Sequence, residues 1–533
     1  MLALLRRHSN FTKFGCRTIR RFRVLDGNLS LDQSERDRLA DEAQKSEELY
    51  QEKLAQIMAG SSASAVARHT QKNKKLLARD RIKLLVDQDY PVLELSALAG
   101  LDMEYGDVLS AGIVGCIAKV SGQLCVINAN DATVKGGTIY PISLKKQLRL
   151  QEICEQNNLP AVYLIDSGGA FLPLQSEIFV EGGRSFYNEA IMNSKGIPQL
   201  CMVAGSCTAG AAYIPTMANE VVMVDKIGTI FLAGPPLVHA AIGQQITEEA
   251  LGGATVHCEV SGCADYKAKD EIDAIDTMKD VLSTLNLPEF LPKLSFVEDP
   301  FFNEEDLSIL SVKRDADGKL DTKKIVARIV DGSRFHEYKP TYGREIICGF
   351  ARLGSMLVGV VANDGRFTPQ SCLKASNFVC LCDERGIPLV FLQDILKVEN
   401  AETAIELIKY QAELMSYVAT TQVPKITIIM GNSFGVGNYA MCGRSMSPRF
   451  LFSWPTARVS IHSVDDMKQT INNDEKHLQR LEREVTSVYG SSRIWDDGIV
   501  LPKDTRQALI QSLTASMMHK ETKKSSNKNV VRL

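Results

Sequence analysis

The sequence lacks the features that mark several large classes of protein. It has no run of apolar residues long enough to cross a bilayer, so we expect no membrane insertion. Its 61 basic and 64 acidic side chains leave a net charge of −3, so we also expect no nucleic-acid partner. The 13 cysteines form no pair of CxxC motifs, and we therefore expect reduced, mostly buried thiols and no metal site.

Acidic residues are also absent from the start of the chain, where the first is Asp26. The preceding segment carries cations interleaved with apolar residues: Arg6, Arg7, Lys13, Arg17, Arg20, Arg21 and Arg23. An Arg-rich, acid-free, amphipathic start is typical of a mitochondrial presequence. We therefore predict a presequence over residues 1–27 and a location in the mitochondrial matrix, with a basic disordered arm as the alternative.

The sequence contains an internal repeat, which fits a length of 533 residues that allows two or three cores. Three pairs of segments match at offsets of 228, 226 and 233 residues: 158–166 with 386–394, 196–205 with 422–431, and Asn130-Asp131 with Asn363-Asp364. Near-constant offsets over three separated blocks indicate a duplication.

Each long block has the same local pattern. A proline opens a short apolar run, a glycine-rich turn closes it, and a helix-compatible stretch follows. Continuous apolar runs favour strands buried on both faces, which means a parallel sheet covered by helices. We therefore predict two copies of one α/β unit, over residues 28–290 and 313–533, with a linker over 291–312. Residues 33–87 alternate charges at helical spacing and predict solvated or interfacial helices.

Two glycine-rich turns align at the same offset, 205–213 and 431–439. In each, small residues end a strand and a helix is expected to begin. Backbone N–H groups at a helix start have no partner within the helix, so such a turn can hold a developing oxyanion. Tight packing between strand and helix is the alternative explanation.

A set of motifs resembles the acyl-CoA carboxylase β-subunit (carboxyltransferase) family, and is closest to its methylcrotonoyl-CoA branch. The motifs lie at 130–137, 166–170, 205–210, 228–236, 328–335, 438–444 and 495–498. The resemblance runs from about Leu76 to about Arg506. It implies tandem duplicated crotonase-like (ClpP/crotonase) spiral domains, with acyl-CoA bound in the first and carboxybiotin received in the second.

The activity that the resemblance implies is transfer of a carboxyl group from carboxybiotin to 3-methylcrotonoyl-CoA, a reaction of leucine catabolism. The resemblance implies that no side-chain base is required, because carboxybiotin breaks down to carbon dioxide and a biotin enolate that can deprotonate the acyl-CoA. One oxyanion pair stabilises the thioester enolate and the other stabilises the biotin enolate. By position, the backbone N–H groups of Gly210 and Ala211 face the thioester, and those of Val436 and Gly437 face biotin. The implied acyl-CoA-binding residues are Lys135, Gly168, Gly169 and Ala170, although a lone lysine such as Lys135 is more often simply a solvated side chain.

A partner is implied as well. The chain has no lysine in a biotin-attachment context and no ATP-binding glycine loop. The resemblance therefore implies a biotin-bearing α subunit that uses ATP and bicarbonate. Family β subunits form hexameric cores, so we expect a homo-oligomer.

The second copy departs most from the family pattern. Val436 replaces a small residue at the second turn, and residues 395–399 replace a glycine-containing loop. In the first copy, Ala211 stands for a glycine and Leu174 for an arginine. The alternative function is therefore a catalytically weak or dead paralogue that assembles with, or regulates, an acyl-CoA carboxylase.

Two other motifs allow rival interpretations. Residues 431–435 match the nucleophile elbow of serine hydrolases around Ser433, with Asp465 and His519 as weak partners. The repeat argues against a hydrolase, because the equivalent residue is Cys207 in a similar turn. Residues 435–440 fit a dinucleotide fingerprint, but no acidic residue ends the next strand.

Overall fold

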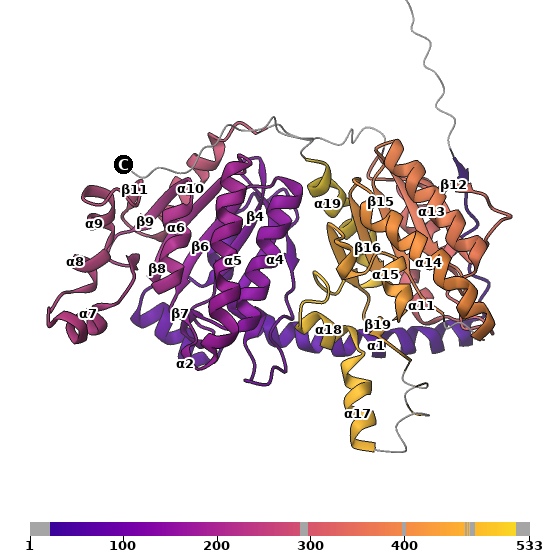
Figure 1. Cartoon of the computed structure of the whole chain (residues 1–533), viewed down its shortest axis with the longest axis horizontal. Helices are drawn as coiled ribbons and strands as arrows, with labels where there is room; N and C mark the ends of the chain where they lie inside the picture. Colours follow the sequence, from indigo (N-terminus) through magenta and orange to yellow (C-terminus); the bar gives the residue numbers. More distant parts are fainter. Residues whose placement is uncertain are drawn as a thin grey trace, which may run out of the picture.

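The computed structural model describes residues 22–287, 297–396, 401–463, 466, 468 and 475–518, without the side chains of 401–404. Most of the predicted presequence and the first part of the predicted linker lie outside these residues. The described chain has two halves, each built on one mixed sheet (Figure 1).

The first sheet combines an antiparallel edge with a parallel centre. Strands β2 to β4 are antiparallel, and β4, β6, β8, β9 and β11 run parallel. A further strand, β10 (Thr229–Phe231), pairs with the end of β8. In spatial order the sheet is β11 (Tyr266–Ala268), β9 (Glu220–Val224), β8 (Gln199–Thr208), β6 (Ala161–Ser167), β4 (Gln123–Asn130), β3 (Ile113–Val120) and β2 (Leu93–Leu95).

The second sheet repeats this plan. Strands β1, β12, β13 and β14 are antiparallel, and β14, β15, β16 and β18 are parallel. Its order is β1 (Arg23–Val24), β12 (Arg334–Tyr338), β13 (Ile346–Leu353), β14 (Met356–Asn363), β15 (Leu389–Gln393), β16 (Lys425–Ile429) and β18 (Phe450–Ser453).

The register confirms the predicted duplication. Ala161 of β6 pairs with Gln199 of β8, and the equivalent Leu389 of β15 pairs with Lys425 of β16. Every residue of β6, β15 and β16 is buried, as continuous apolar runs predict for central parallel strands.

The helices that follow the hairpins are also equivalent. Helices α4 (Pro141–Asn157) and α13 (Pro369–Glu384) both begin with proline. The Ser143 hydroxyl accepts from the Tyr140 N–H (3.1 Å), and the Ser371 hydroxyl accepts from the Thr368 N–H (2.9 Å). These contacts satisfy a backbone donor just before each helix and fix where it starts.

Helices cover both faces of each sheet. The first sheet lies between α4 on one face and α3 (Ala78–Leu85) with α10 (Glu271–Ser283) on the other. The second lies between α13 with α14 (Ala401–Thr420) and α12 (Thr322–Ile329) with α19 (Thr505–Met517). One hydrophobic cluster contains buried residues of both halves, among them Ile153 and Leu513, and so joins the halves into one body.

Two segments differ from their predicted roles. Arg23 and Val24 fall within the predicted presequence, yet they form β1 against β12 of the second sheet. Residues 306–312 fall within the predicted linker, yet they form helix α11 with Leu307 and Leu310 fully buried. Local composition gave no sign of either, because both are held by residues distant in the sequence.

Helix α1 (Gln33–Ala59) runs along both halves (Figure 1). Arg36 pairs with Asp306 (3.1 Å), and the Tyr50 hydroxyl donates to the Ile499 carbonyl (3.1 Å). The remaining helices are α2 (Ala63–Ala67), α5 (Gln175–Ser194), α6 (Tyr213–Met217), α7 (Pro235–Ile242), α8 (Glu248–Gly252), α9 (Ala254–Glu259), α15 (Val436–Ala440), α17 (Glu475–Glu484) and α18 (Ser487–Ser492). Among the described residues, no helix is long and apolar enough to cross a membrane.

Candidate active site

Two buried aspartates mark the carboxyl ends of equivalent strands. Asp166 is the second-to-last residue of β6 and Asp394 directly follows β15, and each is 3% exposed. The backbone N–H of Asp166 donates to Asn130 Oδ1 and that of Asp394 to Asn363 Oδ1, both at 3.4 Å. The side chains of Asn130 and Asn363, which belong to the aligned Asn-Asp motifs, therefore fix the ends of these two strands.

Each aspartate is neutralised by a cation from outside the repeated motifs. Lys75 Nζ lies 3.1 Å from Asp166 Oδ1, and Arg314 Nη1 lies 2.8 Å from Asp394 Oδ2. A buried carboxylate without such a partner would be costly. Sequence comparison of the halves misses both cations, because neither lies in the three matched pairs of segments.

The aspartates also explain the first glycine of each turn. A Cβ at Gly205 would overlap the Asp166 carboxylate, and one at Gly431 would overlap the Asp394 carboxylate. The strand can pass the aspartate only if that residue has no side chain.

The predicted oxyanion donors lie on equivalent backbone. Ala209 has φ +56° and precedes Gly210 and Ala211, while Gly435 has φ +57° and precedes Val436 and Gly437. The first pair lies in the 3₁₀ turn η5 (Ala209–Ala212), and the second pair opens α15. As residues of a first helical turn, all four have N–H groups without an acceptor inside the helix.

The surroundings of the two turns differ. Gly210 is exposed, and a Cβ there would meet only Phe186 Cζ, at 3.8 Å. Its equivalent Val436 carries an isopropyl group that is 48% exposed. A Cβ at Gly437 would lie 2.8 Å from Ile395 Cγ2, so the Ile395 side chain packs against the backbone of the second turn.

The predicted acyl-CoA residues gather beside the first turn. The N–H of Gly168 donates to the Gly137 carbonyl (3.2 Å), and β7 (Gly169–Ala170) pairs with β5 (Thr138–Ile139). Gly169 has φ +84°, and a Cβ there would lie 3.3 Å from the Thr208 carbonyl. Lys135 is exposed on the neighbouring turn η3 (Lys135–Gly137).

A pocket of about 180 Å³ adjoins these turns. It reaches Gly136, Gly168 and Ser206 on one side, and on the other side it is lined by side chains of the segment after α1. Those side chains are Arg68, His69, Asn73 and Lys75. Motif matching does not identify this segment, but its charge does, because residues 53–79 contain six cations and no acid.

Ser433 has the environment of a structural residue. It is fully buried, donates to Gln393 Oε1 (2.7 Å) and accepts from Asn438 Nδ2 (2.7 Å). Both hydrogen bonds tie the strand to the turn, which argues against a nucleophile. Its suggested partners, Asp465 and His519, lie outside the described residues.

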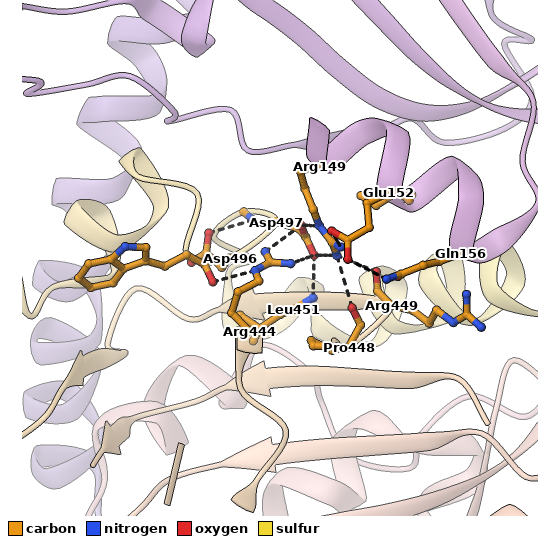
Figure 2. Close-up of polar contacts among 12 residues, drawn as sticks. Arg149, Glu152, Gln156, Arg444, Pro448, Arg449, Leu451, Asp496 and Asp497 are labelled. Atoms are coloured by element: carbon orange, nitrogen blue, oxygen red, sulfur yellow. Dashed lines mark hydrogen bonds and ion pairs between the residues drawn. The ribbon is translucent and has the colours of Figure 1, made fainter. Parts of the chain in front are cut away.

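A larger cleft of about 1000 Å³ lies between the halves and reaches α15 through Asn438 and Tyr439. Beside it, Asp497 is fully buried and binds Arg149 of α4 (2.8 Å) and Arg444 (2.9 Å), as Figure 2 shows. These two guanidinium groups outweigh burial and hold the pKa of Asp497 well below its usual range.

The neighbouring Asp496 lines the cleft and has the opposite electrostatics. Burial raises the pKa of Asp496 to about 6. Among the described residues, no group of three or more His, Cys, Asp or Glu side chains is arranged to hold a metal ion.

Comparisons with known proteins place this geometry in a family. A family model described as "Carboxyl transferase domain" matches residues 69–531. The mitochondrial methylcrotonoyl-CoA carboxylase beta chain of Dictyostelium discoideum is 43% identical over 530 residues, which is 94% of this chain and 90% of that protein. A probable methylcrotonoyl-CoA carboxylase beta chain of Drosophila melanogaster is 44% identical over 508 residues, 87% of each chain. The beta subunit of P. aeruginosa geranyl-CoA carboxylase has a TM-score of 0.87 at 34% identity, covering 96% of this chain and 100% of that one.

Proposed function

The chain belongs to the carboxyltransferase subunits of the biotin-dependent acyl-CoA carboxylases, and we propose that it carboxylates 3-methylcrotonoyl-CoA with carboxybiotin as donor. The observation that carries the proposal is the pair of equivalent turns, whose helix-start N–H groups suit two developing oxyanions. The substrate follows the names of the relatives that are 43–44% identical over most of the chain.

The first turn fits a thioester. Gly210 leaves open space above its backbone, so the carbonyl oxygen can reach the N–H groups of Gly210 and Ala211. The turn at Gly168, Gly169 and Ala170 then positions the thioester. Carboxybiotin, when bound, supplies the carboxyl group, and the N–H groups of Val436 and Gly437 hold the charge that develops on its side.

The test is carboxylation of 3-methylcrotonoyl-CoA by the complex with its biotin-bearing partner. Gly210→Pro removes one donor and should lower kcat by about a hundredfold to a thousandfold. Gln33→Pro, at the first position of α1, is the matched control and should leave the rate unchanged. A Gly210→Pro complex with full activity would contradict the assignment.

We further propose a homo-oligomeric core, hexameric as in the family, bound to an α subunit that carries biotin and uses ATP and bicarbonate. Equivalent helices expose apolar side chains: Phe179 is 82% and Val180 78% exposed on α5, and Ile405 is 71% and Ile408 67% exposed on α14. Faces of this kind are normally covered by a partner. A stable monomer in light scattering at micromolar concentration would contradict the oligomer.

The proposed location is the mitochondrial matrix, supported by the Arg-rich start and by the names of the relatives. Import into isolated mitochondria followed by N-terminal sequencing tests this. A chain that stays outside with Met1 retained would contradict it.

A second candidate function is a paralogue with weak transfer activity. It is favoured by Val436, which adds bulk where the first turn has Gly210, and by Ile395, which packs under Gly437. In that case 3-methylcrotonoyl-CoA binds at micromolar concentration while transfer is nearly absent, and Val436→Ala restores only part of the rate. Calorimetry measures the binding of 3-methylcrotonoyl-CoA, and a transfer assay on the same complex measures the rate of carboxyl transfer. Together they distinguish the two candidate functions, and full-rate transfer by the unmodified complex excludes the weak paralogue.

A further inference from the structure

The helix that carries the second donor pair is too short to hold itself in place. Helix α15 has five residues, and a helix of that length is not stable without contacts to the rest of the protein. Its first two residues, Val436 and Gly437, are the proposed oxyanion donors. The direction of their N–H groups is therefore set by the side chains that hold α15 against the second sheet.

Three polar side chains link the sheet to this helix through consecutive hydrogen bonds. The Asn438 amide donates to the hydroxyl of Ser433 in β17 (Asn432–Phe434), and that hydroxyl donates to Gln393 Oε1, both at 2.7 Å. The Gln393 amide N–H donates to the carbonyl of Met441, just past the end of α15 (2.5 Å). Gln393, the last residue of β15, thus holds the helix at both ends, through Ser433 and directly.

The two side chains that come from the sheets are fully buried. Gln393 and Ser433 each have 0% of their surface exposed. Removing water from an amide and a hydroxyl costs free energy, which their hydrogen bonds offset only where the geometry is good. A buried network of this kind therefore restricts the backbone to the arrangement that satisfies it.

The first half lacks this network. At the positions that the repeat makes equivalent it has residues without an amide or a hydroxyl group: Ile165, Cys207 and Ala212. There the Cys207 thiol donates to the Ala211 carbonyl (2.9 Å), a contact between the two ends of the turn itself. The first turn forms without the network, so the shared backbone does not require it. Its role is specific to the second turn.

We infer that Gln393 and Ser433 are positioning residues for the transfer reaction. Together they set the direction of the N–H groups of Val436 and Gly437 toward carboxybiotin. The inference rests on the proposed function, in which those N–H groups hold the charge that develops on the biotin side. An oxyanion donor contributes fully only when it is held at hydrogen-bonding distance from the developing charge, and a small displacement loses much of the rate.

The experiment measures carboxylation of 3-methylcrotonoyl-CoA by variants of the complex with its biotin-bearing partner. Ser433→Ala and Gln393→Met remove the hydrogen bonds with little change in volume, and each should lower kcat about tenfold to hundredfold. Kd for 3-methylcrotonoyl-CoA, measured by calorimetry, should not change, because the thioester binds in the first half. Ser433→Cys keeps a weaker donor and should lose less of the rate.

The matched control is Thr505→Val, at the start of α19 on the other face of the second sheet. Thr505 is fully buried and also bridges two partners, because it accepts from the Trp454 indole (2.8 Å) and donates to the Pro502 carbonyl (2.7 Å). Thr505→Val should lower the midpoint of urea unfolding about as much as Ser433→Ala does, and should leave kcat unchanged. Equal loss of kcat in these two variants, or full kcat in Ser433→Ala and Gln393→Met, would overturn the inference.

Amide hydrogen exchange tests the positioning apart from activity. In Ser433→Ala, exchange across residues 434–441 should become faster, while exchange across the equivalent residues 208–215 stays the same. Unchanged exchange across 434–441 would overturn the inference. Failure of the unmodified complex to transfer the carboxyl group would instead contradict the proposed function, and hydrogen exchange would still decide whether the network holds the turn.

Discussion

Single residues at the strand ends have roles set by neighbours distant in sequence. Gly205 is required by the carboxylate of Asp166, and Gly431 by that of Asp394. Asp166 in turn depends on Lys75, which also lines the pocket beside Gly168. The glycines at the start of the two predicted oxyanion turns, Gly205 and Gly431, are therefore needed at least in part for packing against the aspartates.

Gly205→Ala should destabilise the protein by about 1–3 kcal/mol or more, because the new methyl group overlaps the buried Asp166 carboxylate. The measurement is the midpoint of urea unfolding. Gly183→Ala is the control: that glycine lies within α5 with no atom near its missing Cβ, so alanine should stabilise the protein by about 0.5–1 kcal/mol. Equal effects of the two changes would refute the steric explanation.

Asp496 gives a prediction about pH. Burial raises its pKa in the folded protein to about 6, above the unfolded value of 3.8, so its stability contribution is present below pH 4 and is lost as pH rises through 6. Asp496→Asn should therefore match the parent protein near pH 4. Between pH 4 and 6 it should gain about 1.4 kcal/mol per pH unit relative to the parent. A difference that is constant over this range, measured by chemical unfolding, would contradict the shift.

At the scale of elements, the duplication is preserved in the starts of helices as well as in the strands. Helices α4 and α13 share proline, the serine contact and a buried lysine, Lys146 in one and Lys374 in the other. The residue before the donor pair has nearly the same φ in both turns, +56° at Ala209 and +57° at Gly435. The side chains around the donors differ, since Gly210 corresponds to Val436 and Gly437 packs against Ile395.

Ser143→Ala and Ser371→Ala should each lower the free energy of unfolding by about 1 kcal/mol, because each removes the acceptor for a backbone N–H at a helix start. Ser283→Ala, at the exposed end of α10, should change stability by less than about 0.5 kcal/mol. Thermal unfolding of the three variants provides the comparison. Similar losses of stability in all three variants would contradict the role given to Ser143 and Ser371 at the helix starts.

At the scale of the whole molecule, the halves are joined by a shared hydrophobic cluster, by α1 and by Asp497 (Figures 1 and 2). Asp497 repeats a device of the first half, where Asp265 accepts from the Val221 N–H (2.7 Å) as Asp497 accepts from that of Leu451 (2.9 Å). Asp497 also binds Arg149, an arginine of the other half.

Asp497→Asn should cost about 3–5 kcal/mol near neutral pH, because it removes the buried carboxylate shared by Arg149 and Arg444 and leaves Arg149 paired only with the partly exposed Glu152. The pKa of Asp497 is depressed in the folded state, so this contribution is present above the unfolded pKa near 4 and is lost as pH falls below it. Unfolding midpoints of variant and parent should therefore converge in acid. Asp265→Asn is the control, and we expect it to lower the free energy of unfolding by less. A larger loss from Asp265→Asn than from Asp497→Asn would refute a special role for the contact between Asp497 and Arg149.

The sequence by itself determined the duplication, the α/β class and the family, because these rest on apolar periodicity, glycine positions and motifs that are local. It also placed the donor residues Gly210, Ala211, Val436 and Gly437 on equivalent turns, since strand–turn–helix patterns are short-range. Their part in catalysis stays a proposal.

Only the tertiary structure decided which distant residues complete these turns. Lys75 and Arg314 reach their aspartates across long separations in sequence, Arg149 reaches Asp497 from the other half, and β1 adds residues near the start of the chain to the second sheet. The pocket beside Gly168 likewise needs the segment at Arg68 to fold back over it. Such contacts depend on how the packed halves bring chain segments together, and local residue preferences carry no information about that.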